Sequence, residues 1–526
     1  MAHGEFPRYV AHTTLLVLIA ASLAGCGNPE SDSRTLFLAL ETPPNKIDPA
    51  LAVDVAGGQI VSLIYQGLVR FSPEGKLEPD AATAWEIEDD GHRYVFTMDR
   101  QARFSDGSAV TAGDVVSSFE RVLAPRSLSS RRWVLDRIRG AGEFSDGKTA
   151  SVAGLSTRGD STVVIELAEP FRPFIELLGM PAARIVHANS GPATGESTDS
   201  IPVGSGMWML GDWRRGDYVS LVPNRHHPEH ARNIDEIRYR IIPQAFTRIA
   251  EYESGTLDIL KIPLAELDRY LSDPANSEFI QSRPELRVLY IGLNTQRGPL
   301  KDVRVRRALN MAVNVDQIIE VLTGGRGVRA TGSVPPTLGG YEERDAYPYD
   351  PQGARRELSA AGFPEGFSIE VWQRDSPDGN RIVEAVQGYL REVGVEVRIV
   401  KREWSAFKEA VGQGKVDAFF LDWYADYPDA ENFLFPLFHS ANVGGGGNRA
   451  FLKNADVDAL IERSHALTDP EEAWAVYAET DRMIYDLAPW IYLYFPRSFV
   501  LVSPRVLGYV YPALYLGEDF STIQKN

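Results

Sequence analysis

The sequence is short of several features on which common function classes depend. Cys26 is the only cysteine among 526 residues, which excludes an intrachain disulfide and a cysteine-rich zinc site. Lys and Arg number 54 against 72 Asp and Glu, a formal net charge of −18, and such an acidic surface repels a phosphate backbone, so nucleic-acid binding is excluded. The apolar run Thr13–Gly25 falls short of the roughly 20 residues that span a bilayer, so a polytopic membrane protein is excluded as well. With 44% hydrophobic residues the chain can still bury real cores, and its length predicts about three domains.

The amino-terminal segment predicts export. The run Thr13–Gly25 has the length of a signal-peptide hydrophobic region, and it ends in Leu23-Ala24-Gly25-Cys26, which resembles a bacterial lipobox. In that pattern the peptidase cuts before the cysteine and the thiol carries a diacylglycerol. We therefore expect a lipoprotein signal peptide over 1–25, lipidation of Cys26, and a polar tether over 26–34 that holds the protein at a membrane in the periplasm or at the cell surface. An ordinary signal peptide with an incidental cysteine is the alternative.

The stretch 366–426 predicts an α/β sheet. Its hydrophobic periodicity alternates between strand and helix, giving strands at 367–372, 395–400 and 416–423 and helices at 380–393 and 404–412. This β-α-β-α-β order favours parallel strands. In open α/β sheets ligands bind beyond the carboxyl ends of the strands. The aromatic and acidic loop Tyr424–Asp429 follows the last of these strands, so we expect the site there.

Further elements follow from the same reasoning. We expect strands at 35–40, 94–98, 162–167 and 490–495, and helices at 60–70, 301–322, 456–466 and 471–486. Thr111 is expected to cap a helix start, Gly324-Gly325 to end the helix 301–322, and Asp469-Pro470 to open the helix at 471.

Two patterns imitate sites of known chemistry. Residues 142–149, GEFSDGKT, match the phosphate-binding loop G-x-x-x-x-G-K-[ST], but no apolar strand precedes them and no clear helix follows, so we expect a surface loop and no nucleotide. The cluster His226-His227-Pro228-Glu229-His230 lacks a metal-binding spacing, and Pro228 prevents the helix that would align two imidazoles. We expect no cofactor, no metal and no catalytic residue.

A family resemblance runs in order from about residue 35 to 515. Its segments include Ile47–Ala50, the blocks 65–70 and 80–121, Val203–Gly206, 302–314, Glu403-Trp404 and 423–427. Together they resemble the extracytoplasmic solute-binding proteins of family 5, the oligopeptide and dipeptide receptors of ABC transporters. The resemblance implies an α/β, two-lobe periplasmic-binding-protein-like fold of type II with an extra small domain, mixed sheets, flanking helices and a hinge. The implied division is lobe I over 35–66, 170–285 and 490–526, an inserted small domain over 67–169, and lobe II over 286–489.

The resemblance also implies binding residues. Asp426 occupies the position at which the oligopeptide receptors bind the α-ammonium group of a peptide, although it could instead cap its loop or pair with a local arginine. Trp404, Trp423 and Tyr424 fall at or beside positions that line the ligand, with core packing as the alternative for both tryptophans. Two arginines of the enteric oligopeptide receptors correspond here to Val411 and Phe420, and a histidine to Asn380, so the anchor for the ligand's carboxylate is open; Arg132 is a candidate replacement.

The resulting functional prediction is a monomeric, lipid-anchored receptor. It would close on a short peptide and present it to an ABC transporter permease, without catalysing a reaction. The alternatives are a receptor of the same fold for a nickel chelate, a sugar or an opine, an exported hydrolase whose residues meet only on folding, and a chaperone or signalling sensor.

Overall fold

The computed structural model describes residues 1, 34–191, 193, 202–229 and 233–526. Cys26, the expected signal peptide after Met1 and the expected tether up to residue 33 therefore lie outside the described residues. Within the described part of the chain, every helix is too short or too polar to traverse a bilayer.

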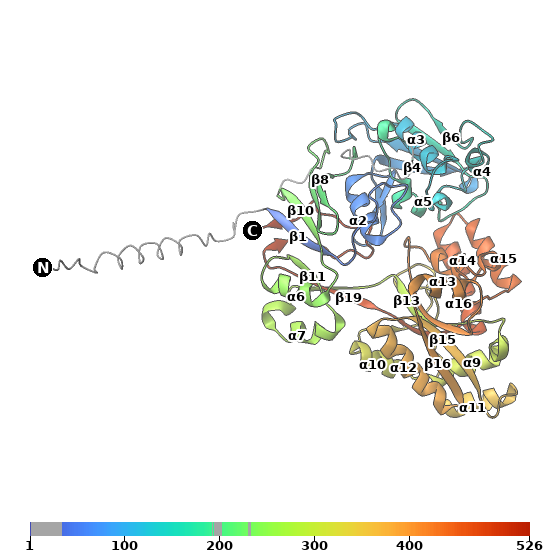
Figure 1. Cartoon of the computed structure of the whole chain (residues 1–526). Helices are drawn as coiled ribbons and strands as arrows, with labels where there is room; N and C mark the ends of the chain where they lie inside the picture. The colour runs from blue at the N-terminus through green and yellow to red at the C-terminus, as the bar shows by residue number, and fades with distance from the viewer. Residues whose placement is uncertain (2–33, 192, 194–201, 230–232) are drawn as a thin grey trace.

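Lobe I contains two sheets (Figure 1, left). The first has the order β1-β10-β9-β8, and the second the order β11-β19-β12. Their bounds are β1 Thr35–Leu40, β8 Trp208–Arg214, β9 Tyr218–Pro223, β10 Glu236–Ile241, β11 Ile259–Lys261, β12 Ile280–Pro284 and β19 Arg497–Val502. The helices of this lobe are α2 Val55–Ile64, α6 Ala245–Glu253, α7 Leu267–Leu271 and α8 Pro274–Ser277. Strand β1 pairs in parallel with β10.

The small domain (Figure 1, upper right) is built on the sheet β4-β5-β7-β6. Its strands are β4 Ala82–Glu88, β5 Arg93–Met98, β6 Leu155–Thr157 and β7 Thr162–Glu166, with the ribbon β2 Val69–Phe71 and β3 Leu77–Pro79 beside them. The helices are α3 Ala112–Leu123, α4 Ala141–Ser145 and α5 Phe174–Leu177. Thr111 caps α3 in a capping box with Asp114, which confirms the expected helix start.

Lobe II is organised around a six-stranded sheet of order β14-β18-β13-β17-β15-β16 (Figure 1, lower right). Its strands are β13 Arg287–Leu293, β14 Val328–Arg329, β15 Phe367–Arg374, β16 Val395–Arg402, β17 Ala418–Tyr424 and β18 Trp490–Phe495. The helices are α9 Val303–Ala312, α10 Val315–Thr323, α11 Pro351–Ala360, α12 Pro377–Glu392, α13 Trp404–Gly412, α14 Glu431–Phe438, α15 Ala455–His465 and α16 Pro470–Leu487. Strand β15 lies parallel to both β16 and β17, so the expected β-α-β-α-β unit is confirmed.

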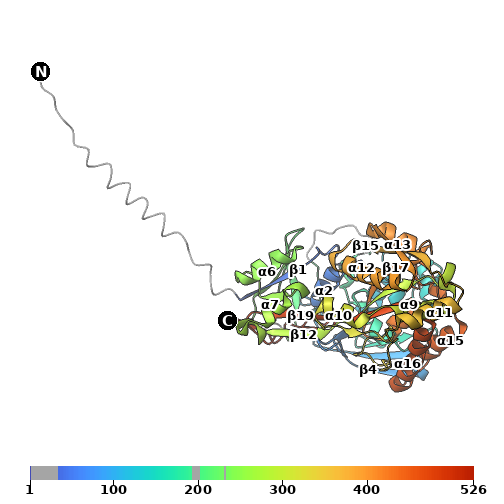
Figure 2. The ribbon, with the colours of Figure 1, turned by 90° about the horizontal axis from the view of Figure 1, so that it is seen from below.

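The chain crosses between the lobes at two adjacent points. Strand β12 of lobe I runs into β13 of lobe II, and β18 runs back into β19. The crossings are held together because Pro284 pairs with Arg497 and the main-chain N–H of Glu285 donates to the carbonyl of Pro496 at 2.9 Å. Seen from below, the sheets of lobe I and lobe II lie at opposite ends of the molecule (Figure 2). Because β18 pairs with β13 and β14, the return to lobe I begins after Phe495 and not at 490 as expected.

Two expected helices have different bounds. The helix expected over 60–70 is α2, which begins after the cap Asp54 and ends at Ile64, since Tyr65 is extended. The helix expected over 301–322 is broken into α9 and α10, because Val313 is extended and the Asn314 side chain accepts a hydrogen bond from the N–H of Gln317 and so starts a new helix. The last turn ends as predicted, with Gly324 in the left-handed conformation.

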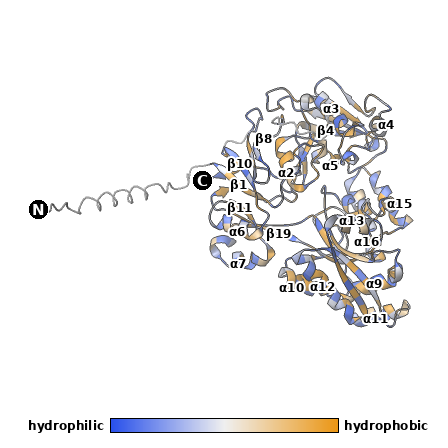
Figure 3. Ribbon diagram, in the orientation of Figure 1, coloured by the Kyte–Doolittle hydropathy of each residue, from blue (hydrophilic) through white to orange (hydrophobic). Residues whose placement is uncertain are grey.

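Hydrophobic residues concentrate where the elements meet (Figure 3). Strand β18 is buried along its whole length, as expected for a central strand. Gly292 on the neighbouring β13 leaves room for the buried ring of Phe419, which a side chain at that position would strike. Val411 and Phe419 lie in the core, and Phe420 packs against it; the positions where the resemblance places arginines are therefore apolar packing positions.

Candidate functional site

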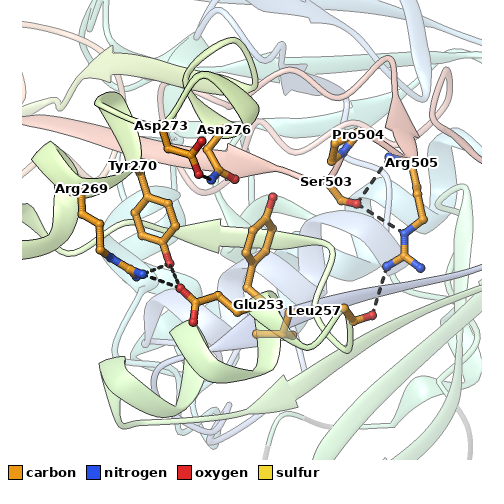
Figure 4. A pocket seen from close by; sticks show the side chains of 11 residues that line it. Glu253, Leu257, Arg269, Tyr270, Asp273, Asn276, Ser503, Pro504 and Arg505 are labelled. Atoms are coloured by element: carbon orange, nitrogen blue, oxygen red, sulfur yellow. Dashed lines mark hydrogen bonds and ion pairs between the residues drawn. The ribbon is translucent and has the colours of Figure 1, made fainter.

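One sizeable hollow in the described part of the chain belongs to lobe I alone. It has a volume of about 510 Å³ and is lined from α6, α7, α8 and residues 503–505. Its charged groups already have partners (Figure 4): Arg269 donates to Glu253 at 2.7 Å, Arg505 donates to the carbonyl of Gly255 at 3.1 Å, and Asp273 accepts from Asn276 at 2.6 Å. A ligand in this hollow would contact one lobe only.

The second hollow lies between the lobes. Its volume is about 420 Å³, within the range of small-ligand sites. Lobe I contributes the end of β1, the start of α2, β11, β12 and the segment 509–515, and lobe II contributes Arg287 and Tyr424. The tyrosines that line it are Tyr239, Tyr424, Tyr509, Tyr511 and Tyr515. We call this hollow the cleft and take it as the candidate site, because a ligand here touches both lobes.

The cleft presents hydroxyl donors over aromatic walls. Burial raises the pKa of Tyr424, and nearby Glu285 raises it further. Burial also raises the pKa of Tyr515, with an added contribution from the Asp426 carboxylate. Both phenols therefore remain protonated and able to donate a hydrogen bond to a ligand.

Asp426 lies in the loop that follows β17, beside the cleft. Its main-chain N–H donates to Asn432 Oδ1 at 3.0 Å, and the same oxygen accepts from Trp423 Nε1 at 3.2 Å. Asn432 is 2% exposed, so this buried amide fixes the loop that carries the carboxylate. Burial raises the pKa of Asp426, against the lowering effect of Arg131. A half-buried carboxylate of this kind, with a side chain that is 28% exposed, favours a cationic partner.

The cation that faces Asp426 is Arg131, not Arg132. Arg131 Nη1 lies 3.4 Å from Asp426 Oδ1 and Arg131 also donates to the carbonyl of Val53 at 3.2 Å. Arg132 turns back onto its own loop and donates to the carbonyls of Ala124 at 2.8 Å and Ser127 at 2.7 Å. Main-chain acceptors therefore engage the guanidinium of Arg132, the residue considered as a candidate anchor for the ligand's carboxylate.

Of the other predicted binding residues, one lines the cleft and the rest do not. Tyr424 lines the cleft, and Trp423 positions Asn432 while packing against the main core. Trp404 begins α13, stacks on Phe407 and is 38% exposed, away from the residues that line the cleft. The side-chain amide of Asn380 forms local hydrogen bonds: it accepts from Gln373 at 2.9 Å and donates to Asp375 at 2.9 Å.

A buried ion network joins the small domain to lobe II, and sequence reasoning missed it. Arg172, which precedes α5, donates to Asp429 of lobe II and to the Tyr477 hydroxyl at 3.2 Å. The side chains of Arg172 and Asp429 are only 10% and 6% exposed. The Arg172 N–H donates to the carbonyl of His465 at 2.9 Å, and Glu176 lies 3.8 Å from the guanidinium. The only sequence signal was the acidic loop 424–429, which contains Asp429.

The two imitated motifs are surface features. Residues 142–149 run from α4 into a turn, where Lys148 pairs with the exposed Asp146 at 2.8 Å, so no strand–loop–helix arrangement for phosphate is present at this point. Among the described residues, which leave out His230, no group of three or more His, Cys, Asp and Glu side chains is placed to hold a metal ion.

Comparisons with known proteins agree with this architecture. Residues 76–445 match the model of the bacterial extracellular solute-binding proteins, family 5. The chain is 31% identical over 504 residues to heme-binding protein A of Haemophilus influenzae, covering 91% of this chain and 90% of the relative. It is 28% identical over 517 residues to the dipeptide-binding protein of Escherichia coli, covering 94% and 95%. The solved structure of the periplasmic binding protein DppA from Helicobacter pylori in complex with the peptide STSA superposes with a TM-score of 0.77 at 25% identity, covering 93% of this chain and 98% of that one.

The match covers more than half of the chain and agrees with the two lobes, the paired crossings and the cleft described above. The resemblance inferred from the sequence is thereby confirmed. The chain belongs to the bacterial extracellular solute-binding proteins of family 5.

Proposed function

We propose that this protein is a lipid-anchored receptor that captures short peptides in the cleft and delivers them to the permease of an ABC transporter. Cys26 would carry the lipid, and the receptor would act as a monomer without catalysis or a cofactor. The dipeptide-binding relative and the neighbour solved with a bound peptide support this ligand class.

The observation that carries the proposal is the free main-chain edge of β1 in the cleft. In the parallel pairing of β1 with β10, the carbonyl of Leu40 accepts from Ile242, whereas Phe37 turns its main chain the other way, toward Asp258. By the alternation of a strand, Ala39 and Glu41 also face away from β10. Both residues line the cleft, and β1 pairs with no second strand among the described residues. An extended peptide could therefore add to this edge through main-chain hydrogen bonds.

Asp426 supplies a second feature suited to a peptide. It is a carboxylate with a raised pKa beside the cleft, and a peptide's α-ammonium would displace Arg131 from it. In a cleft that excludes water such a charge-assisted hydrogen bond is strong.

The test is a thermal-shift measurement of the purified protein with a pooled tri- to pentapeptide library and with the same pool N-acetylated. We expect the free pool to raise the melting temperature and the acetylated pool to have little effect. Asp426→Asn should lose the response, whereas Asp378→Asn, an exposed site in lobe II (side chain 81% exposed), should keep it. No response to either pool would reject the peptide receptor in favour of a different solute.

A further inference from the structure

The basic side chains that line the cleft differ in whether they are already paired. Arg248 lies 3.2 Å from Glu41, Arg283 lies 3.7 Å from Glu74, and Arg287 lies 2.8 Å from Asp422. The fourth is Lys261, whose ammonium group makes no hydrogen bond or ion pair with any described residue. Lys261 is thus the one cation of this lining, within the described chain, that is free to bind a ligand.

The position of Lys261 is fixed by a short, buried strand. It ends β11, in which Ile259 and Leu260 are buried and Lys261 is exposed toward the cleft. The strand is held because Lys261 pairs with Val500 of β19. The ammonium group is therefore presented to the cleft from a rigid element and not from a loop.

The lysine is charged, and its nearest carboxylates are engaged elsewhere. Burial acts to lower the pKa of Lys261, but Tyr511, Glu285 and Glu41 raise it on balance. Glu285 already accepts from Arg287 and from the Ser498 hydroxyl, and Glu41 accepts from Arg248. Three ammonium donors are left for an acceptor supplied by the ligand.

We propose that Lys261 binds the carboxylate at the carboxy-terminal end of the peptide. The inference rests on the proposed function and adds the second anchor of the ligand. An ammonium group meeting a free carboxylate forms the strong, charge-assisted pair that a main-chain amide cannot offer. It also offers a cation in place of the arginine anchors that the apolar residues Val411 and Phe420 do not supply.

The two anchors lie at different places along one segment of the cleft wall. Lys261 interacts electrostatically with Tyr511, and Asp426 with Tyr515. Tyr511 and Tyr515 both line the cleft, so a peptide that lies along this wall passes from the Lys261 side to the Asp426 side.

The experiment compares four peptide pools of two to five residues: free, N-acetylated, C-amidated and doubly blocked. Thermal shifts and dissociation constants are measured for the wild type, Lys261→Met, Lys261→Arg and the control Lys453→Met, an exposed lysine of lobe II that does not line the cleft. We expect amidation to weaken binding to the wild type and to Lys453→Met by about 10- to 100-fold. Lys261→Met should bind the free pool as weakly as the wild type binds the amidated one, with no further loss on amidation, and Lys261→Arg should restore the discrimination.

The outcomes separate the two proposals. Binding that depends on the free amino terminus but not on the free carboxylate overturns the Lys261 anchor and leaves the peptide receptor standing. An amidation penalty that persists in Lys261→Met also overturns it, provided that the melting temperature without ligand shows a folded variant. No binding of any pool overturns both.

Discussion

Replacing Arg172 by methionine removes the cation of the buried network that joins the small domain to lobe II. In the closed arrangement, Asp429 and Glu176 would then lie buried without their positive partner. Removing one member of a buried ion pair costs about 3–5 kcal/mol. The lobes can avoid this cost by separating, because water then reaches Asp429. The penalty is therefore expected to fall on closure, and at about 1.4 kcal/mol per factor of ten it corresponds to a dissociation constant about 10²- to 4 × 10³-fold higher.

The assay is isothermal titration with a peptide identified in the pooled screen, together with small-angle scattering of the ligand-free protein. The control is Arg463→Met, which breaks the exposed pair with Glu479 (side chains 54% and 44% exposed) and should change affinity little, since such pairs contribute at most about 1 kcal/mol. We expect Arg172→Met alone to bind weakly and to have a larger radius of gyration. Unchanged affinity and dimensions, combined with a lower melting temperature, would show that the lobes do not part at this network and would refute the reasoning.

Three further predictions concern the same region. Burial and the Asp429 carboxylate raise the pKa of Glu176 to about 7. Because the folded-state pKa then exceeds the unfolded value, the free energy of unfolding falls as the pH rises from about 4.5 to 7. Glu176→Gln should flatten this decline in melting experiments between pH 5 and 8, and equal slopes for the variant and the wild type would contradict the prediction. Asn432→Ala leaves the N–H groups of Trp423 and Asp426 without their acceptor and should lower stability by about 2 kcal/mol, measured by urea unfolding; an unchanged midpoint would mean that another group replaces the amide. Arg131→Met removes the competitor of a ligand ammonium at Asp426 and should tighten binding of peptides with a free amino terminus by about tenfold at pH 8; weaker binding would show that Arg131 itself holds the ligand.

The sequence was sufficient to predict a helix or strand wherever the element carries its own hydrophobic periodicity and capping residues. The unit from β15 to β17 was predicted because strand and helix periodicities alternate there with capping residues between them, and the sheet confirms it. The break between α9 and α10 was not predicted, since the hydrophobic face continues through it and only the Asn314 side chain, capping Gln317, separates the helices. Strand β18 was predicted as a strand, but its sheet was not, because its partner β13 lies about 200 positions earlier in the chain.

In the site, too, local sequence located some residues, whereas the roles of others depend on contacts with distant parts of the chain. The loop Tyr424–Asp429 could be located because it follows a predicted strand at the end where ligands bind. Asp426 and Tyr424 were singled out within it by the family resemblance, and their role in binding stays a prediction. Arg131 and Arg132 are adjacent and indistinguishable in the sequence, yet one faces a carboxylate 295 positions away and the other faces carbonyls of its own loop. The proposed role of Lys261 as a ligand anchor depends on which neighbouring charged side chains are already paired, and no sequence pattern predicts that pairing.

The placement of these groups connects ligand recognition to closure. Asp426 comes from lobe II, whereas the β1 edge and Lys261 come from lobe I, and the chain passes between the two at 284–287 and 495–497. On the proposed function, a peptide held by its amino terminus at Asp426 and by its main chain and carboxylate on lobe I contributes binding energy only when both lobes contact it. A ligand that reaches one lobe gains nothing from closure, since it does not distinguish the open from the closed form. The Arg172–Asp429 pair then adds to the closed form a contribution that does not depend on which side chains the peptide carries, so one cleft could accept varied peptides while still requiring two free ends.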